Sequence, residues 1–227
     1  MEKNFYLTVS QLRELDRKAV EEFHISIETL MENAGEAAAR FIVHRLRQTE
    51  IPPPWAAVIF CGGGHNGGDG LACARFLQSF NVNAEVILLK DETSLKGETL
   101  NQFQKLKKSK VSYSVLPDSK QINKSIQKAS ILVDSLLGTG FRVPVQESLR
   151  HVIEAMNQSE KPIAAVDIPS GLDADTGETI GPCVEAHETI TFAAMKKGFL
   201  NTNSKKWTGK ITVTNIGFPQ ALLDFFK

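Results

Sequence analysis

Residues 56–77 read AAVIFCGGGHNGGDGLACARFL, and this stretch decides the fold. Its first six residues are apolar and partly β-branched, which indicates a buried strand, and residues 68–80 have the pattern of a helix. Six of the ten residues from Cys61 to Gly70 are glycine. Glycine lets the backbone turn sharply and pass close to other groups. The stretch therefore predicts a strand, a tight loop and a helix, in that order.

The same alternation continues to the end of the chain. Apolar runs predict strands at 56–61, 84–89, 111–116, 131–136, 163–168, 189–194 and 210–216, and helix-like stretches lie at 68–80, 94–110, 119–129 and 144–158. Continuous apolar strands between amphipathic helices predict a mainly parallel sheet with helices on both faces. This is a Rossmann-like, doubly wound α/β fold. Because the last two strands lie close in sequence, the end of the sheet is expected to depart from strict alternation.

The first 50 residues carry only helix signals and form an N-terminal helical arm before a core at 55–217. Thr8 and Gln11 fit a capping box for a first helix, and Ser26 fits the N-cap of a second. Because Ala34 and Gly35 have little or no side chain, another element of the fold can pack closely against this side of the second helix. We expect a single domain over residues 1–227, with no further fused domain.

Composition excludes several classes of protein. Lys and Arg number 26, as do Asp and Glu, so the formal net charge of zero speaks against nucleic-acid and anionic-membrane partners. The three cysteines form no C-x-x-C pair, which speaks against a disulfide framework or a zinc ribbon. The N-terminus lacks the layout of a signal peptide, and no apolar run approaches the roughly 20 residues of a membrane helix. These features predict a cytoplasmic protein.

Parallel sheets bind ligands at the carboxyl ends of their strands. Gly62, Gly64 and Gly67 match G-x-G-x-x-G between a strand and a helix, and Asp91 lies near where a ribose-binding carboxylate belongs, so a nicotinamide dehydrogenase is one hypothesis. Asp69 complicates it, because a carboxylate at a helix N-terminus competes with phosphate for the same amides. An equally good interpretation makes Asp69 a simple helix N-cap.

Three later strand ends also carry polar side chains. Asp134 ends an apolar strand and needs a hydrogen-bond partner, an ion pair or a cation there. Asp167 precedes a stiff turn around Ser170, which makes it a candidate general acid or base. Lys196 follows the next strand and becomes important only if it turns toward these acids.

Five motifs occur together: LMENAG at 30–35, the glycine loop at 61–70, VDSLLGTG at 133–140, VDIPSGLDADTG at 166–177 and TFAAMKKG at 191–198. With them the chain resembles the NAD(P)H-hydrate epimerase family, also called the YjeF N-terminal domain. That family has a Rossmann-like fold and usually forms homodimers. Its members are isomerases that interconvert the R and S epimers of hydrated NADH and NADPH, damaged cofactors with a hydroxyl group at C6 of the nicotinamide ring. A separate dehydratase then repairs the S epimer.

The resemblance also implies roles for single residues. Asp167 would be the acid/base catalyst in contact with substrate, with Lys196 orienting the substrate or sharing the proton transfer. A potassium ion would be held by Asn66, Asp134 and Ser170, whose oxygen atoms suit a hard cation. The other substrate-binding residues would be His65, Asn66, Gly67, Gly68, Asp69, Gly138, Thr139, Gly140, Phe141, Arg142, Val143 and Pro144.

Two other functions stay open at this point. A non-catalytic nucleotide-binding or protein-interaction module would share the fold, but the presence of the motif acids argues for activity. A dehydrogenase would need a partner for hydride transfer such as a Tyr-x-x-x-Lys pair. Neither Tyr6 nor Tyr113 is followed by that lysine.

Overall fold

The structure is a computed structural model that describes residues 5–140, 147–179 and 181–227. Its centre is a seven-stranded sheet in which all neighbouring strands run parallel. The strand order is β4 (Ser112–Val115), β3 (Asn83–Leu88), β2 (Ala56–Cys61), β5 (Ile131–Ser135), β6 (Ile163–Val166), β7 (Glu188–Phe192) and β9 (Lys210–Thr214). The predicted Rossmann-like, mainly parallel sheet is confirmed.

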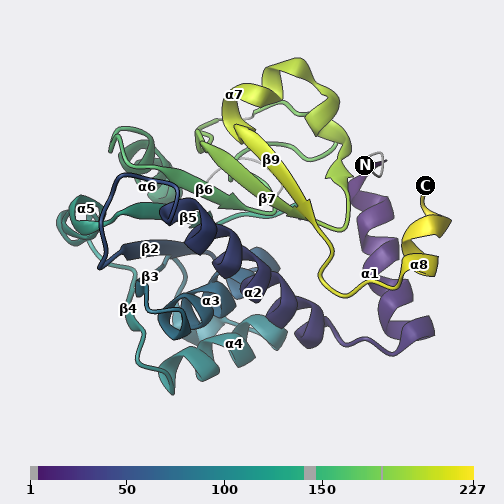
Figure 1. Ribbon diagram of the computed structural model, residues 1–227, viewed down its shortest axis with the longest axis horizontal. Helices are drawn as coiled ribbons and strands as arrows, with labels where there is room; N and C mark the ends of the chain where they lie inside the picture. The colour runs from purple at the N-terminus through teal and green to yellow at the C-terminus, as the bar shows by residue number, and fades with distance from the viewer. Residues whose placement is uncertain (1–4, 141–146, 180) are drawn as a thin grey trace.

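Helices cover both faces of this sheet (Figure 1). One layer holds α2 (Ile27–Leu46), α3 (His65–Ser79) and α4 (Gly97–Lys107), and the opposite layer holds α5 (Ser119–Lys128) and α6 (Glu147–Asn157). Between β7 and β9 the chain forms only short elements, as the sequence predicted: β8 (Met195–Lys196), η2 (Lys197–Leu200), η3 (Thr202–Ser204) and α7 (Lys205–Thr208). The remaining elements are η1 (Glu92–Ser94) and the terminal β1 (Tyr6–Leu7), α1 (Val9–Phe23) and α8 (Gln220–Phe225).

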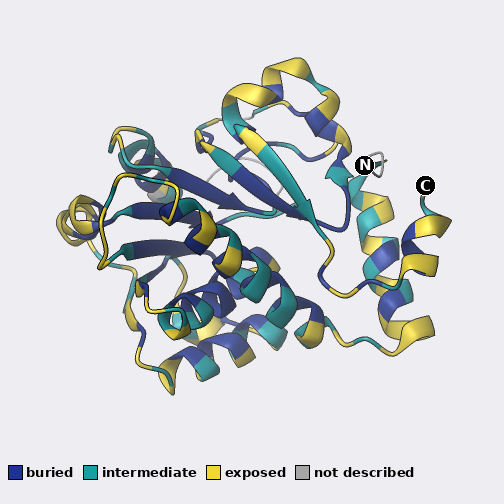
Figure 2. Cartoon of the chain, in the orientation of Figure 1, coloured by how far each residue is buried: buried dark blue, intermediate teal, exposed yellow. Residues whose placement is uncertain are grey.

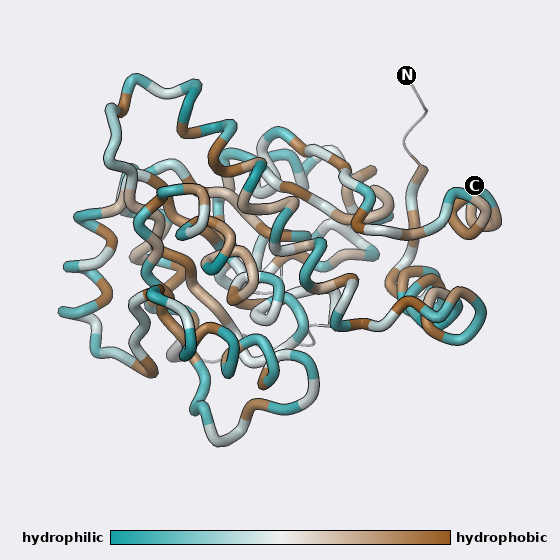
Figure 3. Tube along the Cα trace, turned by 60° about the horizontal axis from the view of Figure 1, so that its bottom comes forward, coloured by the Kyte–Doolittle hydropathy of each residue, from teal (hydrophilic) through white to brown (hydrophobic). Residues whose placement is uncertain are grey.

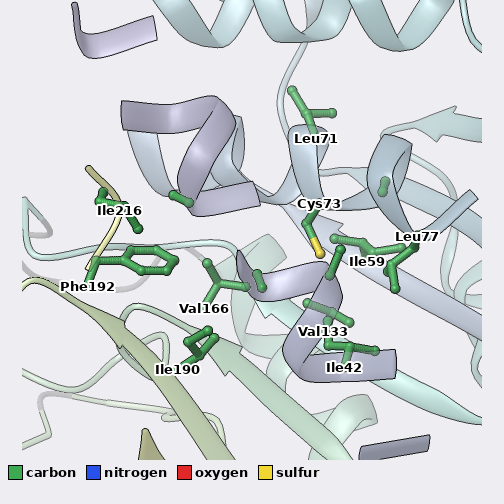
Figure 4. Packing of buried hydrophobic residues seen from close by; sticks show 14 of the residues in the cluster. Ile42, Ile59, Leu71, Cys73, Leu77, Val133, Val166, Ile190, Phe192 and Ile216 are labelled. Carbon is green, nitrogen blue, oxygen red and sulfur yellow. The ribbon is translucent and has the colours of Figure 1, made fainter. Parts of the chain in front are cut away.

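Alternate residues of each strand supply the two hydrophobic cores. In β2, Ile59 and Cys61 face the core beneath α2 and α3, whereas Val58 and Phe60 face α5 and α6. The five inner strands are accordingly buried along most of their length, whereas the edge strands β4 and β9 are more exposed (Figure 2). Figure 4 shows Ile59, together with residues of β5 to β7, meeting side chains of α2 and α3. This two-sided burial explains why the strands read as continuous apolar runs.

The close approach predicted for the second helix is present between α2 and α3. A Cβ atom at Gly35 would lie 2.3 Å from the Cβ of Ala72 and 2.8 Å from the backbone nitrogen of Cys73. Only a residue without a side chain allows this contact, so Gly35 sets the spacing of the layer that leads into the glycine loop.

The N-terminal arm is attached at one edge of the molecule. α1 lies beside α8 and apart from the helical layers, as Figures 1 and 3 both show. β1 pairs with β8, aligning Leu7 with Lys196, and the backbone amide of Val9 donates a hydrogen bond to Asp175 Oδ1 at 2.8 Å. The capping box of Thr8 and Gln11 and the N-cap at Ser26 are confirmed. These contacts hold α1 against the segments that follow β6 and β7.

The helix after the glycine loop begins earlier than the sequence indicated. α3 starts at His65, and its N-cap is Gly64. The interpretation of Asp69 as the N-cap is therefore wrong, because Asp69 lies within the first turns of the helix. The early start depends on Gly67, where a Cβ would stand 1.9 Å from the carbonyl oxygen of Gly62.

The strand order reverses between β2 and β5, which both leave the sheet at the same edge. Such a switch point opens a crevice, because the connections on its two sides run in opposite directions. No helix within the described ranges is both long and apolar enough to cross a membrane.

Candidate active site

A cavity of about 660 Å³ opens at the switch point between β2 and β5. Its walls come from α1, α2, the start of α3 and the loops after β5, β6 and β7. Eight of the predicted site residues line it: His65, Asn66, Asp69, Gly138, Thr139, Gly140, Asp167 and Lys196. The predicted residues Phe141, Arg142, Val143 and Pro144 lie outside the described part of the chain.

The glycine loop presents an open helix end to this cavity. No side chain among the described residues caps α3, so its first amide groups are without the capping partner that most helices have. Gly138 faces them closely, since a Cβ there would lie 3.0 Å from the Cβ of Asn66. An uncapped helix N-terminus beside glycine-rich backbone is suited to binding an anion such as phosphate.

Three of the predicted loop residues have different surroundings. His65 lies at the rim with its side chain 71% exposed, and its Nε2 is 3.8 Å from Glu98 Oε2. Gly67 and Gly68 are buried under the loop, and a Cβ at Gly68 would lie 2.5 Å from Met31 Sδ. These two glycines shape the loop from behind, where side chains would push its backbone out of place.

Asp167 and Lys196 form the central ion pair of the site. Lys196 Nζ donates a hydrogen bond to Asp167 Oδ1 at 2.5 Å, and the lysine side chain is 2% exposed. The same oxygen lies 3.3 Å from the hydroxyl of Thr191. Asp167 directly follows β6 and has a φ of +66°, a conformation that non-glycine residues adopt rarely and often at functional sites. Its backbone amide donates to Ile190 O at 2.7 Å, which fixes the turn.

Two more carboxyl groups lie near this pair. Burial raises the pKa of Asp16 to about 6, and the negative charge of Asp167 adds to the rise. Burial also raises the pKa of Asp69 well above its ordinary value, with further contributions from Asp167 and Asp16. Lys196 opposes both shifts. One buried ammonium group thus lies among three carboxyl groups.

Asp16 was missed by sequence reasoning, together with the neighbouring Arg13 of the cavity wall. Its position did carry a signal. Leu12, Asp16 and Ala19 are spaced by four and three residues, so an acid occupies the apolar stripe of an amphipathic helix. An acid on such a stripe needs a polar neighbour from elsewhere in the fold, and here the stripe faces the cavity.

The three residues predicted to hold a cation lie around Leu137, where Asn66 lines the cavity and Asp134 and Ser170 lie deeper. The backbone amide and hydroxyl of Ser170 donate to the Asp134 carboxylate at 2.7 and 2.6 Å, and Asn66 Nδ2 donates to Leu137 O at 2.9 Å. Asp134 and Ser170 are fully buried. Burial raises the pKa of Asp134 to about 6, against the hydrogen bonds from Ser170 and Leu136.

One atom of this group has no partner. Asn66 Oδ1 is buried and accepts no hydrogen bond among the described residues. A buried carbonyl oxygen without a partner is costly, and a cation would satisfy it. The part of the chain that the structure describes contains no group of three or more His, Cys, Asp or Glu side chains placed to hold a metal ion. The oxygens of Asn66, Asp134 and Ser170 fit a hard monovalent cation better than a transition metal.

Asp91 and the cysteines have other roles. Asp91 is exposed and caps η1 by accepting a hydrogen bond from the Thr93 amide at 2.8 Å. It does not line the cavity as a ribose-binding carboxylate would. Cys61, Cys73 and Cys183 are buried free thiols, and burial raises the pKa of each. They are core residues, not nucleophiles.

Known proteins share both the sequence pattern and the fold. The family model described as "YjeF-related protein N-terminus" matches residues 27–198. The NAD(P)H-hydrate epimerase of Rhodopirellula baltica is 35% identical over 221 residues, which are 97% of this chain and 88% of that protein. The NAD(P)H-hydrate epimerase of Elusimicrobium minutum is 35% identical over 219 residues, 96% of this chain and 97% of that protein.

The chain is also similar to longer proteins and to one solved structure. The bifunctional NAD(P)H-hydrate repair enzyme Nnr of Thermofilum pendens is 35% identical over 95% of this chain, but the match spans only 41% of that protein. The crystal structure of yeast YNL200c superposes with a TM-score of 0.83, covering 98% of this chain and 93% of that chain at 23% sequence identity. This last likeness concerns the fold alone. The chain belongs to the family of YjeF-related N-terminal domains.

Proposed function

We propose that the protein is an NAD(P)H-hydrate epimerase, an isomerase that interconverts the R and S epimers of hydrated NADH and NADPH. The observation that carries the proposal is the buried ion pair of Asp167 and Lys196 at the wall of the cavity of about 660 Å³. The relatives named as epimerases match along nearly the whole chain, which supports the same conclusion.

Two parts of the cavity wall suit two parts of such a substrate, its diphosphate and its hydrated nicotinamide ring. The uncapped N-terminus of α3 and the backbone of Gly138 and Gly140 offer amide groups to a diphosphate. Apolar side chains on the other walls, among them Met31 and Phe192, offer contact surface for the ring of the hydrated nicotinamide. The substrate would then lie across the switch point, with its reacting ring toward Asp167.

Inversion at C6 requires that a bond at this carbon is broken and remade, with protons moved at the attached oxygen. Asp167 is the proposed acid/base group, because its carboxylate is fixed by Lys196 and lies on a rigid backbone turn. Lys196 keeps a positive charge beside the carboxylate and orients it. Both side chains are largely buried, which strengthens the interaction between their charges.

A potassium ion is part of the proposal. Asn66, Asp134 and Ser170 would hold it, and the unpartnered Asn66 Oδ1 supports this assignment. When bound, the ion supplies positive charge beside the glycine loop and offsets the charge of Asp134 and of a bound diphosphate. The resemblance to the family further leads us to propose a homodimer and a dehydratase that acts on the S epimer.

The proposal is tested by chromatography of hydrated NADH. One purified epimer is incubated with and without the protein in potassium buffer, and the appearance of the other epimer is followed over time. We expect the protein to bring the two epimers to equilibrium at least about 100-fold faster than the blank, the scale of acid–base catalysis. Folded protein that leaves the blank rate unchanged would favour the non-catalytic module instead.

A further inference from the structure

One carboxyl group of the cavity lies outside the motifs that identified the family. Asp16 is carried by α1, before the first residue of the family match at 27. It faces the same cavity as Asp69, Asp167 and Lys196. The pairing of β1 with β8 ties α1 to the strand that carries Lys196, so the helix is fixed at the site.

Asp16 differs from the other acids of its helix. Glu14 and Glu21 both pair with Arg17, and Glu22 pairs with Lys18. The carboxyl group of Asp16 has no hydrogen bond or ion pair among the described residues, although it is partly buried. A buried carboxyl group without a partner is unfavourable. A molecule bound in the cavity can supply such a partner.

The surrounding charges set the proton affinity of this group. Asp69 and His65 face it from α3, Asp167 from the turn after β6, Lys196 from β8, and Arg13 lies on the same helix. Lys196 forms its ion pair with Asp167, and no other Lys or Arg of the described residues pairs with Asp16. Burial and the charge of Asp167 raise the pKa of Asp16 to about 6. A group with such a pKa exchanges protons readily near neutral pH.

We propose that Asp16 is a catalytic residue, the second acid/base group of the epimerase site, acting together with Asp167. This inference rests on the epimerase function proposed above and extends it. Two groups are needed because the hydroxyl leaves from one face of C6 and returns on the other.

Asp16 gives its proton to the C6 hydroxyl oxygen while the C6–O bond breaks, and the electron pair of the ring nitrogen forms a C6=N1 double bond. The oxygen leaves as water. A water molecule then adds to the opposite face of C6, the electron pair returns to the nitrogen, and the released proton passes to the carboxylate of Asp167. Proton exchange with solvent restores both groups.

The test compares Asp16→Asn with the wild type in the chromatographic assay. Asparagine keeps the shape and the hydrogen-bonding ability of the side chain but cannot transfer a proton. We expect kcat to fall about 100-fold with little change in KM. In the wild type kcat/KM should decline as the pH rises above about 6, because the acid form of Asp16 is lost, and the variant should lack this decline.

Matched variants separate the role in catalysis from a role in folding. Glu22→Gln removes a negative charge from the exposed side of the same helix and should keep full activity. Asp16→Glu keeps a carboxyl group and should restore part of the rate. Circular dichroism and thermal unfolding verify that each variant is folded.

The outcomes distinguish the two proposals. An active Asp16→Asn variant with the wild-type pH profile, or one in which only KM rises, would overturn the assignment of Asp16 and leave the epimerase function intact. A wild-type protein without epimerase activity would overturn both.

Discussion

Lys196 is almost completely buried, and its ammonium nitrogen lies 2.5 Å from Asp167 Oδ1. The two residues come from different strand ends, 29 positions apart in the chain. A buried ammonium group needs an anionic partner, and its only other hydrogen bond among the described residues goes to Phe192 O at 3.4 Å. The pair therefore fixes the position of the proposed catalytic carboxylate.

Replacement of Lys196 by methionine should damage activity and stability together. The change leaves three carboxyl groups around the cavity without their cation, so we expect kcat to fall at least about 100-fold. The free energy of unfolding should fall by up to about 3 kcal/mol, since removal of one partner leaves the other charge buried without an ion pair. The neighbouring Lys197 is exposed, and Lys197→Met should match the wild type in both measurements. Equal losses in the two variants would contradict a special role for Lys196.

Asp167→Asn should nearly abolish epimerisation, with a loss in kcat of about 100-fold or more. The amide retains the size of the side chain but cannot accept a proton. Asp91→Asn serves as the control, because Asp91 is exposed and lies outside the cavity lining. Wild-type activity in Asp167→Asn would remove this residue from the acid/base role. A raised KM in Asp91→Asn would revive the ribose-binding interpretation.

Potassium should stabilise the folded protein through Asn66. A ligand that binds only the folded state raises the melting temperature in proportion to the logarithm of its concentration. We expect a higher Tm in potassium chloride than in tetramethylammonium chloride at equal ionic strength. Asn66→Ala removes the unpartnered oxygen and should abolish this difference. Asn101→Ala, at an exposed site on α4, should preserve it. An undiminished potassium effect in Asn66→Ala would place the ion elsewhere.

Gly35→Ala should destabilise the contact between α2 and α3. The new methyl group would lie 2.3 Å from Ala72 Cβ, so the helices must move apart. Overpacking of this kind costs roughly 1–3 kcal/mol, which exceeds the gain in helix propensity from alanine. Chemical denaturation measures the loss. Glu36→Ala changes the adjacent, solvent-facing position and should stay within about 0.5 kcal/mol of the wild type. A Gly35→Ala protein more stable than the wild type would show that α2 and α3 can accommodate a methyl group at this contact.

Asp16→Asn should stabilise the protein at high pH while it lowers activity. The pKa of Asp16 rises from an ordinary 3.8 to about 6 on folding, so the folded protein holds this proton more tightly than the unfolded chain does. Stability from this group is full below about pH 4 and is lost as the pH rises through 6. The variant should therefore be more stable than the wild type at pH 8, by on the order of 1–3 kcal/mol, and similar to it at pH 4. Denaturant titrations at the two pH values provide the check, and a variant less stable at pH 8 would contradict it.

Several strands and helix starts could be predicted from short stretches of the sequence. The apolar runs at 56–61 and 163–168 predicted buried parallel strands, because residues on both faces of such strands enter a core. Thr8 and Ser26 predicted helix starts, since capping depends on neighbours in sequence. The start of α3 was not predicted correctly. The helix begins three residues before its predicted start, because its first turn depends on the close packing of Gly67 against Gly62, which is a tertiary contact.

The motifs of the sequence by themselves determined the fold class, the edge of the sheet where the cavity opens and eight of the residues that line it. They did so because strand ends of a parallel sheet meet at one edge, whichever way their side chains turn. Only the tertiary structure decided which groups meet: the partner of Lys196, the burial of Gly67 and Gly68, and the presence of Asp16 in the cavity. Asp16 reaches the cavity through the pairing of β1 with β8, a contact between residues about 190 positions apart. No local pattern encodes such a contact, because it forms only when the chain has folded and the two segments bury their surfaces together.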